Sequence, residues 1–206
     1  MKRTRLRLAL LVVIAVVAAA ALLPATAGAK QLRLGQGKVA VTLDPTYFAL
    51  FLLAGYPIYP AGPAVMDFST ANAVLTLPVT GGVWHTGSNP HGTFVTKGGI
   101  TFIHYSSGLE SLSFTGWRAI VGAGSEGWTG VGKGPNSGSF GVLFDEDLTN
   151  SHTSFTHIHG HKYLEITDVA LTYDSDLQSF YASTFSPSAI PDDTPFGTAT
   201  LLARVK

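Results

Sequence analysis

The chain has 206 residues, with 13 basic and 13 acidic side chains, 46% hydrophobic residues and no cysteine. Without cysteine the protein forms no disulfide and has no thiolate for catalysis or lipid attachment. The lack of an excess of basic residues argues against nucleic acid as a partner.

The N-terminal segment, residues 1–29, predicts a secretory signal peptide. Four basic residues (Lys2, Arg3, Arg5 and Arg7) precede an unbroken apolar run over residues 8–23, and "AGA" at 27–29 has the small-x-small pattern of a cleavage site. The alternative is a retained anchor, because the run is near the minimum length for crossing a bilayer. We expect cleavage, and therefore a secreted or cell-surface protein that touches the membrane only through an uncleaved signal segment.

Residues 30–206 then form the mature chain. Its length of 206 − 29 = 177 residues suits a single domain with its own core. Four of the 13 basic residues leave with the signal, so nine remain against 13 acids, a formal charge of −4. This balance argues further against nucleic acid.

Seven segments of the mature chain alternate apolar and polar residues, which predicts β-strands. These segments are residues 38–44, 73–79, 99–105, 109–115, 141–148, 162–173 and 198–205. Glycine-rich stretches such as "SNPHG" (88–92) and "GKGPNSGSFG" (132–141) read as turns between them. Many short strands with such turns predict an all-β fold, an antiparallel β-sandwich or open barrel.

Two short α-helices accompany these strands. Asp44 suits the cap of a helix that starts at Pro45 and ends at Gly55, and residues 175–185 predict the second helix. Each helix follows a similar strand, since "VAVTLD" (39–44) and "VALTYD" (169–174) match at four of six positions. We expect these two strand–helix units to lie side by side.

The sequence carries no signature of a hydrolase. The G-x-S-x-G elbow is absent, and no spacing of serine and histidine marks a catalytic triad. Among the adjacent acids Asp145, Glu146 and Asp147, at most the first and third share a strand face, so a solvated strand end is the simpler reading. We expect a protein that is not an enzyme.

Three histidines at alternate positions, His157, His159 and His161, predict a metal site. On one strand they would project from one face about 6.5–7 Å apart, and a bend at Gly160 would let neighbours share zinc or copper. The alternative is a histidine-rich strand edge with no specific site. His104 ends another predicted strand, where it is either a half-buried, hydrogen-bonded histidine or a ligand.

The order of several short motifs resembles a known family. The "VTLD" strand leads to a short helix and the "PAGPA" tail, followed by "LPVTGG", "GTFVTKGGITF" and "VLFDEDL", and then by "VALTYD" and "FGTATL". This order, over residues 32–203, is similar to that of the secreted actinobacterial HtaA-type haem-binding domain. The resemblance implies an all-β domain with short helices that holds haem through a tyrosine near its first helix.

The same resemblance assigns residues to a haem site. Tyr47 matches the tyrosine that ligates iron. The family's supporting histidine, in an H-x-G turn, aligns with "TKGG" (96–99), where this chain has Thr96. His104 lies eight residues further on and is the candidate hydrogen-bond partner of Tyr47. Tyr56 and Tyr59, stiffened by the neighbouring Pro57 and Pro60, suit either a binding surface or packing over a sheet.

The sequence therefore predicts an exported, non-enzymatic binding module of the cell envelope or the extracellular space. Its partner would be a small hydrophobic ligand, with haem as the named candidate through Tyr47 and His104, or a cell-envelope protein. One alternative is a structural or adhesive surface protein without a small ligand. The other is a metal-binding protein that uses the histidines at 157–161.

Overall fold

The computed structural model describes residues 30–53, 55–69, 72–104, 110–122, 127–133, 140–184 and 194–206. The predicted signal peptide, residues 1–29, lies outside these ranges. One compact unit spans Gln31–Lys206, and it is the unit described below.

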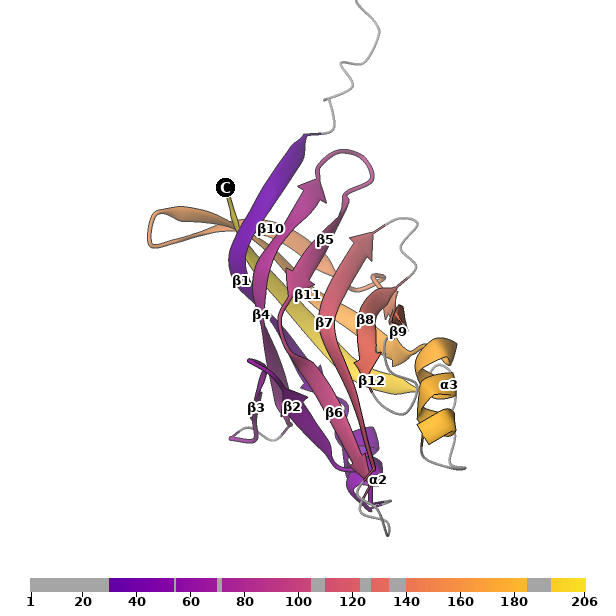
Figure 1. Ribbon diagram of the computed structural model, residues 1–206. Helices are drawn as coiled ribbons and strands as arrows, with labels where there is room; N and C mark the ends of the chain where they lie inside the picture. Colours follow the sequence, from indigo (N-terminus) through magenta and orange to yellow (C-terminus); the bar gives the residue numbers. More distant parts are fainter. Residues whose placement is uncertain are drawn as a thin grey trace, which may run out of the picture. The chain divides into compact units, whose positions relative to one another are not determined.

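This unit is a single 12-stranded sheet with two short helices (Figure 1). The elements in chain order are β1 (Gln31–Leu43), α2 (Pro45–Leu53), β2 (Ile58–Ala61), β3 (Val65–Asp67), β4 (Val74–His85), β5 (His91–Thr96), β6 (Gly99–His104), β7 (Glu110–Gly122), β8 (Trp128–Lys133), β9 (Phe140–Asp147), β10 (His152–Ile158), β11 (His161–Tyr173), α3 (Ser175–Thr184) and β12 (Pro195–Val205).

Eight strands close into an antiparallel barrel. Their order is β7-β5-β4-β1-β12-β11-β9-β8, and the pairing of β8 with β7 completes the ring. Because a closed ring leaves no free edge among its own strands, backbone hydrogen bonds are satisfied all around the wall.

The wall gains three further strands at one end, which we call the wide end because more strands contribute to it. The first part of β7 pairs with β6 instead of β5, and β2 pairs with the outer side of β6. Beside β2, β3 pairs with the start of β4. The helix α2 lies at this end (Figure 1).

The remaining strand, β10, pairs only with β11 and forms a hairpin with it. In Figure 1 this hairpin projects beyond the barrel wall. Most of its residues are exposed, which agrees with a strand that has no layer packed over it.

Aromatic side chains fill the barrel. Alternation along each strand sends every second residue inward, and the three tryptophans, Trp84, Trp117 and Trp128, are all buried. Phe144 stacks on Phe196 with ring centroids 4.2 Å apart. The interior is thus a packed core of interlocking rings.

The two similar strand–helix units flank the same strand. Val41 in β1 and Val169 in β11 both pair with Ala199 of β12, one from each side. The "VAVTLD" and "VALTYD" segments therefore run in the same register but are separated by β12, so they are one strand apart and not directly adjacent.

The fold class predicted from the sequence is confirmed. The domain is all-β and antiparallel with two short helices, and the pairing of β7 with β8 makes it a closed barrel. No helix within the described ranges is long and apolar enough to cross a membrane.

Candidate functional site

The helix α2 places Tyr47 at the wide end of the barrel. Asp44 caps the helix, because its Oδ1 accepts hydrogen bonds from the backbone N–H groups of Thr46 (2.9 Å) and Tyr47 (3.1 Å). Pro45 occupies the first helical position, where its missing N–H costs nothing. Tyr47 is half-buried in this first turn, so its phenol is within reach of solvent and ligands.

One turn after Tyr47, Phe51 anchors the helix to the barrel. Its ring is buried and lies 5.6 Å from the ring of Phe102 in β6 and 6.0 Å from that of Tyr173 in β11. Residues four apart share a helix face. Tyr47 therefore lies on the barrel-facing side of α2.

The end of α2 positions Tyr56. Gly55 adopts a positive φ of 81°, and the N–H of Tyr56 donates to the carbonyl of Phe51 while that of Gly55 donates to Leu52. This is a Schellman cap, which needs a left-handed residue that glycine supplies without strain. The cap turns the chain directly into β2.

The register of β2 against β6 then brings Tyr56 opposite His104. Ile58 pairs with Phe102, and the N–H of Ile103 donates to the carbonyl of Pro57. The rings of Tyr56 and His104 stack with centroids 4.3 Å apart and planes 27° apart. Tyr56 is buried, and so is the Nδ1 atom of His104.

The structure thus brings α2, β2 and β6 together through the contacts of Phe51 with Phe102 and of Tyr56 with His104. The ring that faces His104 is that of Tyr56, a pairing that the sequence analysis did not predict. The assignment of Tyr47 as iron ligand and His104 as its hydrogen-bond partner stays a prediction.

Apolar side chains surround this end of the barrel on the outside. Leu50 and Leu53 of α2 are 52% and 85% exposed, and Phe68, just after β3, is 62% exposed. Phe68 contacts Phe48 of α2, with ring centroids 5.9 Å apart. Leu50 lies one helical turn from Tyr47, so part of this exposed apolar surface adjoins Tyr47, which suits a hydrophobic ligand.

Thr96, at the family's histidine position, has a structural contact. It is buried, and its hydroxyl donates to the backbone carbonyl of Trp117 at 3.1 Å. The side chain therefore points into the wall between β5 and β7 and ties these strands together.

The three histidines of the predicted metal site do not share one strand face. The strand β10 ends at Ile158, and His159 and Gly160 form the turn with φ values of 49° and 76°. His157 pairs with Lys162, whereas His161 pairs with Ile158, so His157 and His161 occupy successive pairs on opposite faces. Within the described ranges no group of three or more His, Cys, Asp or Glu is arranged to hold a metal ion. Metal binding by His157, His159 and His161 stays a prediction that this arrangement does not support.

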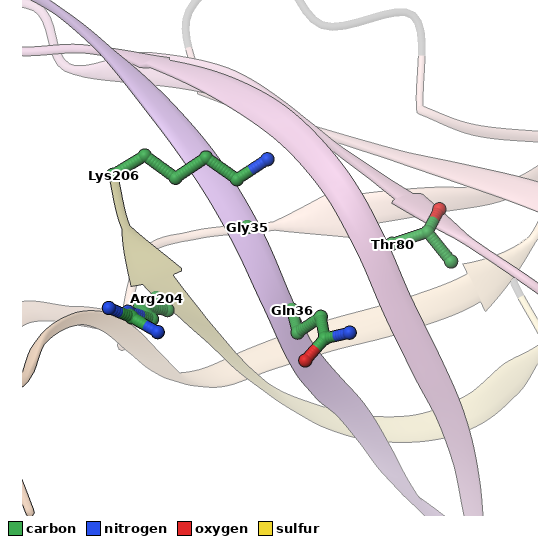
Figure 2. Close-up of a pocket in the computed structure, with 5 residues that line it drawn as sticks. All are labelled: Gly35, Gln36, Thr80, Arg204 and Lys206. Carbon is green, nitrogen blue, oxygen red and sulfur yellow. The ribbon is translucent and has the colours of Figure 1, made fainter.

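An open pocket of about 280 Å³ lies beside the first part of β1, at the end of this strand away from α2. It is lined by Gly35, Gln36, Thr80, Arg204 and Lys206 (Figure 2). A β-bulge in β1 between Leu34 and Gly37 opens this part of the wall. Its two cationic side chains and polar lining do not suit an apolar macrocycle.

Comparisons with known proteins add one informative likeness. No protein-family model matches the sequence, and no curated protein matches it. The C-terminal domain of HtaA from Corynebacterium glutamicum has a similar structure, with a TM-score of 0.58 and 12% identity over 85% of this chain and 99% of that domain. The haem-binding protein HtaB from the same organism aligns with a TM-score of 0.46 and 10% identity over 86% of this chain and 97% of HtaB. The likeness to the HtaA domain confirms the resemblance seen in the sequence at the level of the fold.

Proposed function

We propose that this chain, which has the fold of the HtaA C-terminal domain, is an exported, non-enzymatic module that binds haem at the wide end of its barrel. The observation that carries the proposal is the placement of Tyr47. It lies in the first turn of a capped helix on this fold, half-buried and beside exposed apolar side chains.

The residues at this end fit a haem group in their chemistry. A phenol can ligate ferric iron as tyrosinate, and the apolar side chains Leu50, Leu53 and Phe68 suit the faces and edge of a macrocycle. Haem supplies the iron that gives such a complex its colour and redox chemistry. Tyr47 would hold the iron, and the stacked pair of Tyr56 and His104 would border the site.

Thr96 distinguishes this chain from the family pattern. Its hydroxyl is committed to the carbonyl of Trp117, so it is not the residue that supports the tyrosinate. His104 is the candidate for that role, because it is the histidine that ends β6 at the same end of the barrel as α2.

Export and location outside the cell rest on the N-terminal segment. The compact unit begins at Gln31, within two residues of the predicted cleavage after residue 29. Removal of residues 1–29 would therefore leave the barrel whole. We place the mature protein in the cell envelope or the extracellular space, where a cell-envelope protein is its expected partner.

Haemin titration of the mature chain tests the proposal. We expect a Soret shift and a tyrosinate charge-transfer band at micromolar haemin. Tyr47→Phe should abolish the band and weaken binding at least about tenfold. Tyr59→Phe is the matched control, because Tyr59 is an exposed tyrosine on the nearby strand β2. An unchanged haemin spectrum with the wild-type chain would refute haem binding.

His104 is tested separately as the positioning residue. His104→Ala should shift the pH at which the tyrosinate band appears, because an imidazole that hydrogen-bonds the phenolate oxygen stabilises its ionised form. A band with the same pH profile as the wild type would exclude this role while leaving Tyr47 in place.

One observation favours the alternative of a structural or adhesive surface protein. The barrel interior is filled by buried aromatic rings, including Trp84, Trp117 and Trp128, so the wall is rigid without a ligand. A blank haemin titration on a folded chain would support this alternative.

A further inference from the structure

Two histidines outside the candidate haem site face each other across neighbouring strands. His85 at the end of β4 pairs with His91 at the start of β5, and the chain turns over residues 86–90 between them. Their rings stack with centroids 4.7 Å apart and planes only 11° apart. Because β1 runs from Gln31, beside His85, to Leu43, beside α2, this pair lies at the end of the barrel away from Tyr47.

The sheet fixes the backbone of both histidines. Gln31 of β1 pairs with His85, and Gly122 of β7 pairs with His91, so the two positions lie inside a four-strand row. Both belong to the continuous barrel wall, where backbone motion is restricted by ladders on both sides. Preorganised backbone of this kind is what a metal site needs.

Gly122 allows the backbone of Pro90 and His91 to lie close to β7. A Cβ atom built at Gly122 would lie 2.6 Å from the Cβ of His91 and 2.5 Å from the carbonyl oxygen of Pro90. Its positive φ of 108° also favours glycine. The absence of a side chain here therefore keeps the outer face open next to the pair.

One hydrogen bond determines which nitrogen of His91 carries the proton. Its Nδ1 lies 2.9 Å from the backbone carbonyl oxygen of Asn89. A carbonyl only accepts, so Nδ1 must be the donor, and in the neutral ring Nε2 keeps its lone pair. Metal-binding histidines are commonly held in this way, with the second ring nitrogen donating to a carbonyl.

The separation of the rings is close to that of two imidazoles on one metal ion. With a metal–nitrogen distance of about 2.05 Å and about 1.2 Å from nitrogen to ring centre, each centroid lies about 3.2 Å from the ion. At the tetrahedral angle the two centroids are then about 5.2 Å apart. The observed 4.7 Å is within about half an ångström of this value. The rings are stacked with planes only 11° apart, so at least one ring must rotate about its side-chain bonds before both in-plane nitrogen lone pairs point at one ion.

We propose that His85 and His91 form a two-histidine site for a borderline divalent metal ion, Zn²⁺ or Cu²⁺, on the outer face of the barrel. Two imidazole nitrogens favour these ions over Ca²⁺ and Mg²⁺, which take oxygen ligands. Water completes the coordination shell, since His91 is exposed and His85 half-buried. The site is separate from the haem proposal and from the histidines at 157–161.

Zn²⁺ titration by calorimetry tests the site on the untagged mature chain. The background variant is His157→Gln/His159→Asn/His161→Gln, which removes the hairpin histidines and keeps a residue that tolerates positive φ at 159. We expect one equivalent of Zn²⁺ to bind in this background. His85→Ala and His91→Ala should each weaken binding at least about tenfold, whereas His152→Ala, at an exposed position in β10, should leave it unchanged.

Two spectroscopic measurements keep the test decisive if a variant folds poorly. In the background variant, Zn²⁺ should shift the imidazole ¹⁵N resonances of His85 and His91, and Cu²⁺ should give an electron paramagnetic resonance spectrum with two nitrogen ligands. The proposal is overturned if Zn²⁺ does not bind the background variant, or if both alanine variants bind within twofold of it.

Discussion

Glu146 offers the sharpest test of how the barrel closes. Its carboxylate accepts two hydrogen bonds, from the backbone N–H of Gly122 in β7 (3.0 Å) and from the indole Nε1 of Trp128 in β8 (3.2 Å). One side chain of β9 thus ties the two strands whose pairing completes the ring. Trp128 is fully buried, so its N–H would lose its acceptor at a position with little access to water if the carboxylate were removed.

The expected loss follows from these two contacts. A hydrogen bond to a charged group contributes about 1.5–3 kcal/mol, so Glu146→Ala should lower the free energy of unfolding by about 3–6 kcal/mol. Glu146→Gln keeps one acceptor oxygen and loses the charge, so about half of that loss is expected. At about 2–4 °C per kcal/mol for a domain of this size, the alanine variant should melt roughly 6–24 °C lower.

Urea unfolding followed by tryptophan fluorescence measures the effect. Glu165→Ala is the matched control, because Glu165 is a half-buried acid on the neighbouring strand β11. A substitution there should change stability by about 0.5 kcal/mol or less. If Glu146→Ala lost less than about 1 kcal/mol, the carboxylate would not be the tie that closes the barrel.

Three further predictions concern glycines in β6 and β7, the cap of α2 and the acid-sensitive end of β9. Gly99→Ala places a Cβ 1.7 Å from the carbonyl oxygen of Phe114 and should prevent stable folding. In Gly116→Ala the new Cβ meets no atom within 4 Å, so the free energy of unfolding should fall by only about 1 kcal/mol, because of the positive φ. The soluble yields and the urea midpoints of the two variants are compared. Asp44→Ala should cost about 1 kcal/mol by removing the cap of α2 and should weaken any ligand held by Tyr47, measured by urea unfolding and haemin titration. The hydroxyl and then the backbone N–H of Thr149 lower the pKa of Asp147. The stabilisation by the Asp147 carboxylate is therefore present above its pKa in the unfolded chain and is lost as pH falls through its pKa in the folded chain. Asp147→Asn should flatten the fall in stability below about pH 4. An NMR titration of Asp147 is the direct check.

The sequence predicted those strands and helices whose signals are local. Asp44 and Gly55 marked the ends of α2 because capping uses the side chain or φ of the residue itself. The strands β5 and β8 were not predicted, and the predicted turns "SNPHG" and "GKGPNSGSFG" overlap the start of β5 and the end of β8. In the barrel Gly130 lies close to the buried side chain of Leu143, because a Cβ there would lie 2.6 Å from one of its methyl groups.

The candidate site was predicted less completely for a related reason. Tyr47 was named through the family resemblance, but the stacking of Tyr56 on His104 depends on the register of β2 against β6. The pair of His85 and His91 depends likewise on the register of β4 against β5. Registers between strands are set by side-chain burial on both partners and by turn geometry, which a reading of single segments does not capture. Closure of the ring through β7 and β8 is also a property of the whole sheet.

The pairing of β1 with β12 has a consequence for the time course of folding. Leu34 pairs with Val205 in this ladder, so β1 cannot form this pairing until β12, far along the chain, is available. Until β12 is made, β1 has only β4 as a neighbour, and the barrel cannot complete its wall. Contacts of such long sequence separation make folding slow. The barrel wall can therefore close only once β12 is in place, and we expect resistance to proteases to appear late in folding.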